Sequence, residues 1–201
     1  LIPIIEFFTP ENKRNLNKNE ALQKNEKLFF DILLYLNLPI VFGILSYALF
    51  QFSSLQLTIL QTIGLIFSVG IILGSNGINV AHELGHRNHS FSKWTAKLLL
   101  LPSFYTHFTL EHNFGHHVYV STPEDPATAR FKESVYAFWF RSVIGQYKNA
   151  WKLQLKLNKI NSIPFVSFKN EMLVNSILQV SYLIILFNFF SINIAFYAVA
   201  M

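Results

Sequence analysis

Two short clusters hold five of the seven histidines in this chain. The first cluster, residues 82–86, reads HELGH, and the second, residues 111–117, reads EHNFGHH. A long apolar run comes just before the first cluster, and a shorter one lies between the two. Neutral imidazole is the side chain that most often binds a transition metal, and packing alone does not call for such a composition. The clusters therefore predict a metal centre at the foot of membrane helices.

The spacing within each cluster places imidazole rings side by side on a helix. His82 and His86 are four residues apart, which puts them on one helix face with Cβ atoms roughly 5–6 Å apart. His112 and His116 have the same spacing, and His117 points about 100° away from His116 on the same turn. Such a triplet can reach toward a second metal. We therefore predict five metal ligands, which are His82, His86, His112, His116 and His117.

The first cluster also matches the His-Glu-x-x-His pattern of zinc metalloproteases, in which Glu83 would be the general base. A catalytic zinc ion keeps three protein ligands and one open position, so five imidazoles exceed what it needs. Imidazole donors suit iron, copper, nickel or zinc, and an excess of ligands indicates two metal ions. A membrane zinc protease stays open as the weaker alternative.

Several polar residues near the clusters are candidates for orienting the ligands. A metal-bound histidine commonly donates its other ring nitrogen to a carboxylate. The candidate carboxylates are Glu83, Glu111, Glu124 and Asp125. Arg130 is a further candidate for fixing the loop after the second cluster. We expect His107 to support the site or line its pocket, and we do not count it among the direct ligands.

The composition is that of a membrane protein. Hydrophobic residues make up 52% of the chain and charged residues only 13%, with 21 phenylalanines and a mean hydropathy of +0.35. The sequence contains no cysteine, which excludes disulfides, iron–sulfur clusters and thiolate zinc sites. The net charge of +5 is not distributed like a nucleic-acid-binding surface, so we expect no nucleic-acid partner.

Apolar segments predict an all-α fold, a polytopic transmembrane helical bundle with interfacial helices. Residues 28–50 would form a helix about 34 Å long and residues 55–80 one about 39 Å long, each enough to span a bilayer. Residues 172–190 predict a third span, and residues 194–201 the start of a fourth. We expect residues 1–201 to form one membrane domain, as part of a longer protein.

Two further segments are expected to lie at the membrane surface. Residues 95–110 are apolar but carry Lys97 and Pro102 and are too short to cross alone, which favours a re-entrant or interfacial helix. Residues 134–160 mix aromatic side chains with lysines and arginine, as in an amphipathic helix within the headgroup layer.

The basic residues predict the orientation. All lysines and arginines fall in segments 6–27 and 87–169, and none lies in the short turns 51–54 and 191–193. An even number of crossings puts both basic segments on one side, and the positive-inside rule makes that side cytoplasmic. Segment 81–170 is then a cytoplasmic metal-binding segment, which can receive electrons from a soluble carrier.

Three stretches together resemble one enzyme family. They are residues 82–87, residues 111–117 and the run VSTPEDPATAR at 120–130. These stretches are similar to those of the bacterial alkane 1-monooxygenases, which belong to the membrane non-haem di-iron superfamily that also holds the fatty-acid desaturases. The resemblance is close from about residue 79 to residue 130. Other desaturases or hydroxylases of the superfamily and the xylene-type monooxygenases stay open as alternatives.

The resemblance implies an activity and its partners. The expected reaction is terminal hydroxylation of medium- or long-chain n-alkanes to 1-alkanols, with O₂, two iron ions and reduced rubredoxin. A rubredoxin reductase would supply the electrons, and the alkane would enter from the membrane lipid of a bacterial inner membrane. The family has a third histidine box, and no histidine follows His117 here. We therefore expect the remaining ligands to lie outside this chain, which we interpret as an internal fragment.

Overall fold

The structure, a computed structural model, describes residues 7–8, 17 and 28–201. Residue contacts divide the chain into two units, Leu1–Leu33 and Leu34–Met201. In the first unit, the described residues are Phe7 and Phe8 in a short helical turn, Asn17, and the first turns of a long helix. The basic segment 6–27 lies almost entirely outside the described residues.

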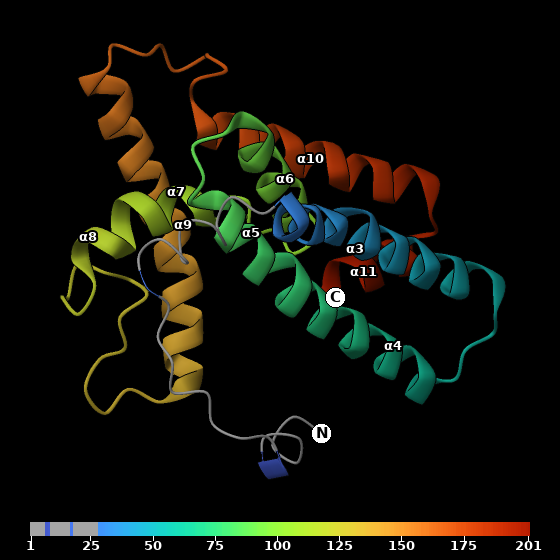
Figure 1. Cartoon of the computed structure of the whole chain (residues 1–201). Helices are drawn as coiled ribbons and strands as arrows, with labels where there is room; N and C mark the ends of the chain where they lie inside the picture. Colours follow the sequence, from blue (N-terminus) through green and yellow to red (C-terminus); the bar gives the residue numbers. More distant parts are fainter. Residues whose placement is uncertain (1–6, 9–16, 18–27) are drawn as a thin grey trace. The chain divides into compact units, whose positions relative to one another are not determined.

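All regular elements of the described residues are helices, and no strand occurs among them, so the predicted all-α class is confirmed (Figure 1). In chain order they are α3 (Leu28–Ser54), α4 (Ile59–Ile72), the π-helix η1 (Leu73–Ile78), α5 (Asn79–Gly85), α6 (Ser90–Leu100), α7 (Phe108–Glu111), the π-helix η2 (His112–His116), α8 (His117–Tyr119), α9 (Val135–Ile160), α10 (Glu171–Phe189) and α11 (Ile192–Ala200).

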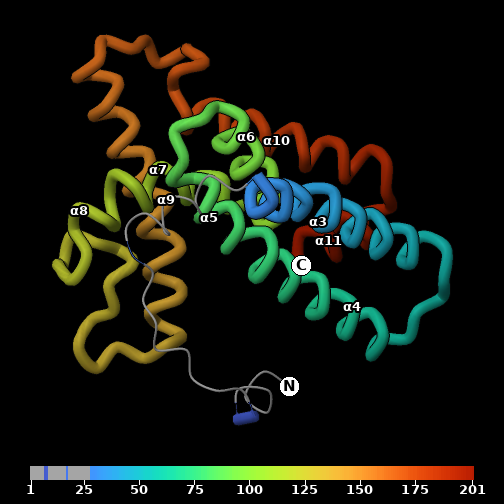
Figure 2. The backbone as a smooth tube through the Cα atoms, in the orientation of Figure 1, coloured from blue at the N-terminus to red at the C-terminus, as the bar shows by residue number. Residues whose placement is uncertain are grey.

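Three helical segments of the described part are long and apolar enough to cross a membrane, namely Leu28–Ser54, Ile59–Gly85 and Glu171–Phe189. The second joins α4, η1 and α5 into one rod (Figure 2). It begins later than the predicted 55–80 span because Thr58 caps α4 with a capping box, in which its hydroxyl accepts from the Gln61 amide. The rod continues to Gly85, so its last turns carry the first histidine cluster.

The main core fixes the rod that carries this cluster. Ala81 and Leu84 on α5 are fully buried against Leu99 and Leu100 of α6, and side chains from α3, α10 and α11 complete the core. A Cβ at Gly77 would lie 3.2 Å from the Leu99 carbonyl oxygen, which shows how closely the two backbones approach. The histidine-bearing end of the rod is therefore held by close packing.

Helix α9 turns a face of small and polar side chains toward the protein, and its exposed side mixes apolar side chains with lysines. Ser134 caps it by accepting from the Ala137 amide, and small or polar side chains four residues apart form its buried face. These are Ser142, Gln146, Ala150, Gln154 and Asn158. Its exposed face carries Tyr136, Trp139 and Phe140. With α7 and α8, α9 lies at the α5 end of the rod (Figures 1 and 2).

Candidate metal centre

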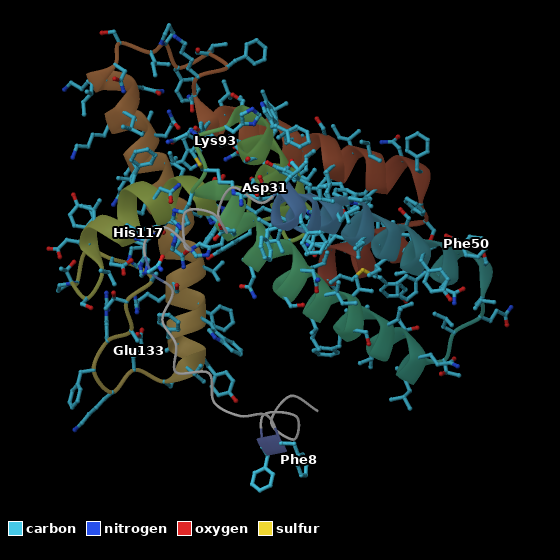
Figure 3. The ribbon with its side chains drawn as sticks, in the orientation of Figure 1. Phe8, Asp31, Phe50, Lys93, His117 and Glu133 are labelled. Carbon is cyan, nitrogen blue, oxygen red and sulfur yellow. The ribbon has the colours of Figure 1, made fainter. Side chains whose placement is uncertain are left out.

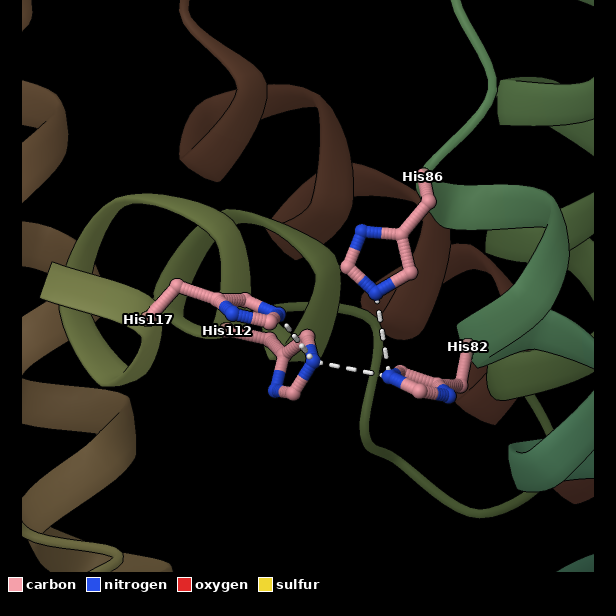
Figure 4. Close-up of side chains that lie close together, drawn as sticks. All are labelled: His82, His86, His112 and His117. Carbon is pink, nitrogen blue, oxygen red and sulfur yellow. Dashed lines mark hydrogen bonds between the residues drawn. The ribbon is translucent and has the colours of Figure 1, made fainter. Parts of the chain in front are cut away.

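Four histidine side chains converge between α5 and the second cluster (Figure 4). His82 lies on α5 and His86 directly follows it as its C-cap, while His112 and His117 come from η2 and α8 on the opposite side. One ring nitrogen from each lies within 4.8 Å of the other three. The His82 and His112 Nε2 atoms are 2.8 Å apart, those of His86 and His82 are 3.1 Å apart, and those of His117 and His112 are 2.9 Å apart. We call this set the four-histidine group.

The geometry and charge state of the four-histidine group suit a metal ion. Two nitrogens bound at right angles about 2.1 Å from one ion would lie about 3.0 Å apart, close to the observed separations. Burial, as the largest cause, and the neighbouring histidines together lower the pKa of His112 to about 4. The His112 ring is therefore neutral at neutral pH, which is the form that binds a metal.

A π-helical turn decides which histidines of the second cluster join the group. In a regular α-helix, His112 and His116 would share a face, and His117 would point about 140° away from His112. The wider turn of η2, which spans His112–His116, brings His117 beside His112 instead. Such π turns occur frequently at functional sites. The predicted i,i+4 neighbours His112 and His116 still stack, with ring centroids 5.3 Å apart, and the i,i+5 pair His112 and His117 adds the contact between ring nitrogens.

His116 is not one of the four converging residues; its ring stacks on that of His112, with centroids 5.3 Å apart, and contacts Asp125. The His116 Nδ1 atom is 2.9 Å from Asp125 Oδ2, and the Asp125 side chain is fully buried. Thr128 Oγ1 and the Ala127 amide also donate to this carboxylate, at 2.6 and 2.8 Å. Burial alone would raise the pKa of Asp125, but these hydrogen bonds outweigh burial and hold it below its ordinary value. The carboxylate fixes the ring so that His116 Nε2 is left to bind a ligand.

Arg141 of α9 holds the loop that carries Asp125. Its guanidinium donates to the Pro126 carbonyl at 3.1 Å and to the Thr128 carbonyl at 2.9 Å, and it pairs with both carboxylate oxygens of Glu133 at 2.6 and 2.7 Å. These bonds from Arg141 are the largest cause that lowers the pKa of Glu133 to about 2. The expected loop residue, Arg130, contributes its backbone amide to Glu133. The sequence offers no motif that points to Arg141.

Glu111 contacts α9 through a hydrogen bond to an amide side chain. It is almost fully buried, and Asn149 Nδ2 donates to its Oε1 at 3.0 Å. Burial raises the pKa of Glu111, while the bond from Asn149 lowers it. A Cβ at Gly115 would lie 2.6 Å from the same Glu111 oxygen and 2.9 Å from Asn149 Nδ2. Glycine at 115 is what allows η2 to pack this closely on α9.

The two clusters are tied together by a residue that the spacing did not single out. Asn113 Nδ2 donates to the Gly85 carbonyl at the end of α5, at 3.1 Å. A Cβ at Gly85 would lie 2.6 Å from Thr109 Cγ2 of α7. Both glycines inside the clusters are therefore contact points between helices. The hydrogen bond from Asn113 to Gly85 connects the second cluster to the first.

The other expected supporting residues form no hydrogen bond to the four-histidine group among the described residues. Glu83 is exposed and forms a long ion pair with Arg87 at 3.9 Å. Glu124 lines a surface hollow beside α9. His107 is buried between the rings of Tyr105 and Tyr147, with centroids 4.7 and 5.2 Å away, and burial lowers its pKa to about 4. Neither ring nitrogen of His107 has a hydrogen-bond partner among the described residues.

The family comparison covers both clusters and the loop that follows them. The model of the fatty acid desaturase family matches residues 57–201. The chain belongs to the fatty acid desaturase family. Both histidine clusters, the Asp125 loop and Arg141 lie inside the matched region of this desaturase-family chain. Membership of this family and the four-histidine group together indicate a metal site in a membrane protein.

Curated relatives of this desaturase-family chain include alkane and xylene monooxygenases. It is 35% identical to alkane 1-monooxygenase 1 of Alcanivorax borkumensis, over 90% of this chain and 44% of the relative. It is 32% identical to an alkane 1-monooxygenase of Pseudomonas putida, over 94% of this chain and 47% of the relative. It is 29% identical to the hydroxylase component of the xylene/toluene monooxygenase of Pseudomonas putida, over 69% of this chain and 38% of the relative. The predicted resemblance is confirmed, and the chain spans less than half the length of these relatives.

Proposed function

We propose that the protein hydroxylates the terminal methyl group of medium- or long-chain n-alkanes to give 1-alkanols, with O₂ and reduced rubredoxin, at a histidine-ligated di-iron site. The observation that carries this proposal is the split of the five predicted ligands. The ring nitrogens of four imidazoles converge, and the fifth, His116, stacks beside them and is held at Nδ1 by a buried carboxylate. A single tetrahedral zinc ion would have no use for the fifth ligand.

We assign His82, His86, His112 and His117 to one ion and His116 to the second. The second ion would then take its remaining ligands from parts of the protein outside this chain. This division agrees with the relatives, of which this chain covers less than half. It also explains why one cluster carries two adjacent histidines, since neighbouring residues on a helical turn point in different directions.

Two bound irons would supply the activation of O₂, with one oxygen atom going to the alkane and the other to water. The residues of this chain hold the ligand rings in place and shape the surroundings. Asp125 accepts from His116 Nδ1 and thereby fixes which nitrogen is free. The group lies at the end of an apolar membrane span, so an alkane dissolved in the bilayer can reach it without crossing water.

For the location, we propose a bacterial inner membrane with the metal centre on the cytoplasmic side. The support is the charge distribution, since the lysines and arginines of the described residues all lie between 87 and 169. Rubredoxin, reduced by its reductase, can reach a cytoplasmic centre by diffusion. The relatives named as alkane 1-monooxygenases favour an electron-dependent oxygenase of this kind.

The test is turnover of the whole protein with rubredoxin, rubredoxin reductase, NADPH and an n-alkane under ¹⁸O₂. We expect a 1-alkanol that carries one ¹⁸O atom. A product with a new double bond and no ¹⁸O would assign the protein to lipid desaturation instead. Oxidation of xylene with no alkane turnover would favour the xylene-type alternative, which the third relative makes the second candidate. Peptide cleavage that depends on zinc would overturn the oxygenase altogether.

A further inference from the structure

A basic hollow lies at the start of the third membrane span. It has a volume of about 340 Å³ and opens between α6 and the segment that leads into α10. Lys93, which Figure 3 labels, lies on α6 and lines this hollow. The residues of this hollow that matter here are Lys93, Trp94, Lys97, Phe168, Lys169 and Glu171. We call it the lysine groove, and its lining contains no histidine of the metal centre.

The lysine groove has more positive than negative charge. Lys97 is 8% exposed, and its Nζ is 2.9 Å from Glu171 Oε2, which neutralises one lysine. Lys93 lies one helical turn before Lys97 on α6, and Lys169 approaches from the other wall. Within residues 28–201, the structure gives neither Lys93 nor Lys169 a carboxylate partner. Lys93 and Lys169 therefore leave two positive charges that no carboxylate of the described residues balances, and an anion in the groove would balance them.

The rim of the lysine groove is aromatic and apolar. Trp94 is 49% exposed and Phe168 is 97% exposed, and the adjoining Val166 is also exposed. Such side chains are typical of the level where a membrane meets water. The apolar span of α10 begins at Glu171, which itself lines the groove. A soluble anion would use the lysines alone, whereas a lipid would use both the charge and the apolar rim.

We propose that the lysine groove binds one anionic phospholipid, with its phosphate between Lys93 and Lys169 and its acyl chains along α10. Basic pockets between membrane helices are known to hold anionic headgroups. Val174 lines the groove, and Ile177, one turn further along α10, is exposed and apolar, which gives the acyl chains a surface to follow. A neutral lipid would leave the two lysines unpaired. None of the proposed metal ligands lines this hollow, although Lys93, Lys97 and Glu171 also line a neighbouring hollow that contains His86.

The test is native mass spectrometry of the whole protein released from lipid nanodiscs of phosphatidylcholine with or without phosphatidylglycerol. We expect one phosphatidylglycerol molecule to be retained through mild activation. The double variant Lys93→Gln, Lys169→Gln should weaken this retention roughly thirtyfold, from the contribution of two basic residues at a membrane surface. The matched control is Lys156→Gln, Lys159→Gln, which removes the same charge from the exposed surface of α9 and should retain the lipid.

Further measurements distinguish a specific lipid site from non-specific attraction to positive charge and from a site for a soluble anion. The variant Lys93→Arg, Lys169→Arg keeps both charges and should retain phosphatidylglycerol. Equal loss of lipid in the α9 control, or equal retention of phosphatidylcholine, would overturn the proposal. Displacement of the lipid by inorganic phosphate at equal concentration would instead show a site for a soluble anion. Because the readout is bound lipid, it does not depend on iron content or on hydroxylase activity.

Discussion

At the scale of single residues, the centre depends on which nitrogen each imidazole presents. The rings of the four-histidine group turn their Nε2 atoms toward one another. The Nδ1 atom of His116 is instead hydrogen-bonded to the Asp125 carboxylate. The buried Asp125 is therefore a positioning residue for His116. Its ionised state is held by Thr128 and by the Ala127 amide, as well as by His116.

The change Asp125→Asn tests this role. The amide oxygen can still accept from His116 and Thr128, which both bond Oδ2, but the charge is lost, and the NH₂ group in place of Oδ1 can no longer accept from the Ala127 amide. We expect roughly a 10–100-fold loss of iron affinity or of alkane turnover in the whole protein. Glu83→Gln makes the same chemical change at an exposed carboxylate and should cost less. Equal losses in the two variants would contradict the division of roles.

A second residue-scale prediction concerns His107. Because it lies between two tyrosine rings and outside the four-histidine group, His107→Ala should lower turnover in a graded way while most of the iron is kept. His112→Ala, by contrast, should lose the metal of the group. Iron content measured on both purified variants decides between these outcomes. If His107→Ala loses iron as completely as His112→Ala, His107 belongs among the ligands.

At the scale of elements, close approach between helices keeps the two clusters together. The glycines at 85 and 115 sit where an added Cβ would collide with α7 and with Glu111 and α9 respectively. A loop clamped by Arg141 carries Asp125 to the same place. These contacts join segments that are far apart in the sequence, so no local sequence pattern predicts them.

The change Gly85→Ala should destabilise the protein by about 1–3 kcal/mol, because its Cβ would lie 2.6 Å from Thr109 Cγ2. Gly64→Ala is the matched control, since nothing lies within 4 Å of the added Cβ there. The double variant Gly85→Ala, Thr109→Ser removes the colliding methyl group and should recover most of the loss. The free energy of unfolding in detergent measures all three. No recovery in the double variant would show that this contact is not the cause.

The pH dependence of the loop follows from Glu133. Arg141 holds the folded-state pKa of Glu133 at about 2, below that of an unfolded chain at about 4.3, so the pair stabilises the fold above the unfolded value. That stabilisation is lost as the pH falls from about 4.3 toward about 2. Glu133→Gln should therefore be less stable than the wild type at neutral pH, and the gap should close at low pH. A stability difference that stays constant over this range would contradict the assigned pairing.

The sequence predicts the apolar spans and the histidine clusters, but it does not predict the π-helical turn that brings His117 beside His112. The apolar runs and the amphipathic pattern of residues 134–160 are local signals, and helix α9 covers Val135–Ile160. The π turn at 112–116 lies where η2 packs on α9, and a regular helical repeat does not predict that His117 meets His112. Arg141 was missed because its carbonyl partners lie more than a helical turn away in the chain.

At the scale of the whole molecule, the proposed orientation puts the metal centre and the soluble electron donor on the same side of the membrane. A reporter inserted after Ser53 or after Asn193 should be exposed to the periplasm, and one near Lys159 should be cytoplasmic. Labelling in sealed inverted vesicles measures this accessibility. Protection of the Lys159 site together with exposure of Ser53 would reverse the orientation and separate the centre from its donor.

The central claim is that the whole protein holds two iron ions, one of them in the four-histidine group. The most direct measurement is the metal content of the purified whole protein by plasma emission spectrometry, for the wild type and for His117→Ala. We predict about two iron ions per chain in the wild type, because five imidazoles exceed one tetrahedral site, and loss of the ion of the four-histidine group in the variant. One zinc ion per chain in the wild type, or full iron content in His117→Ala, would contradict it.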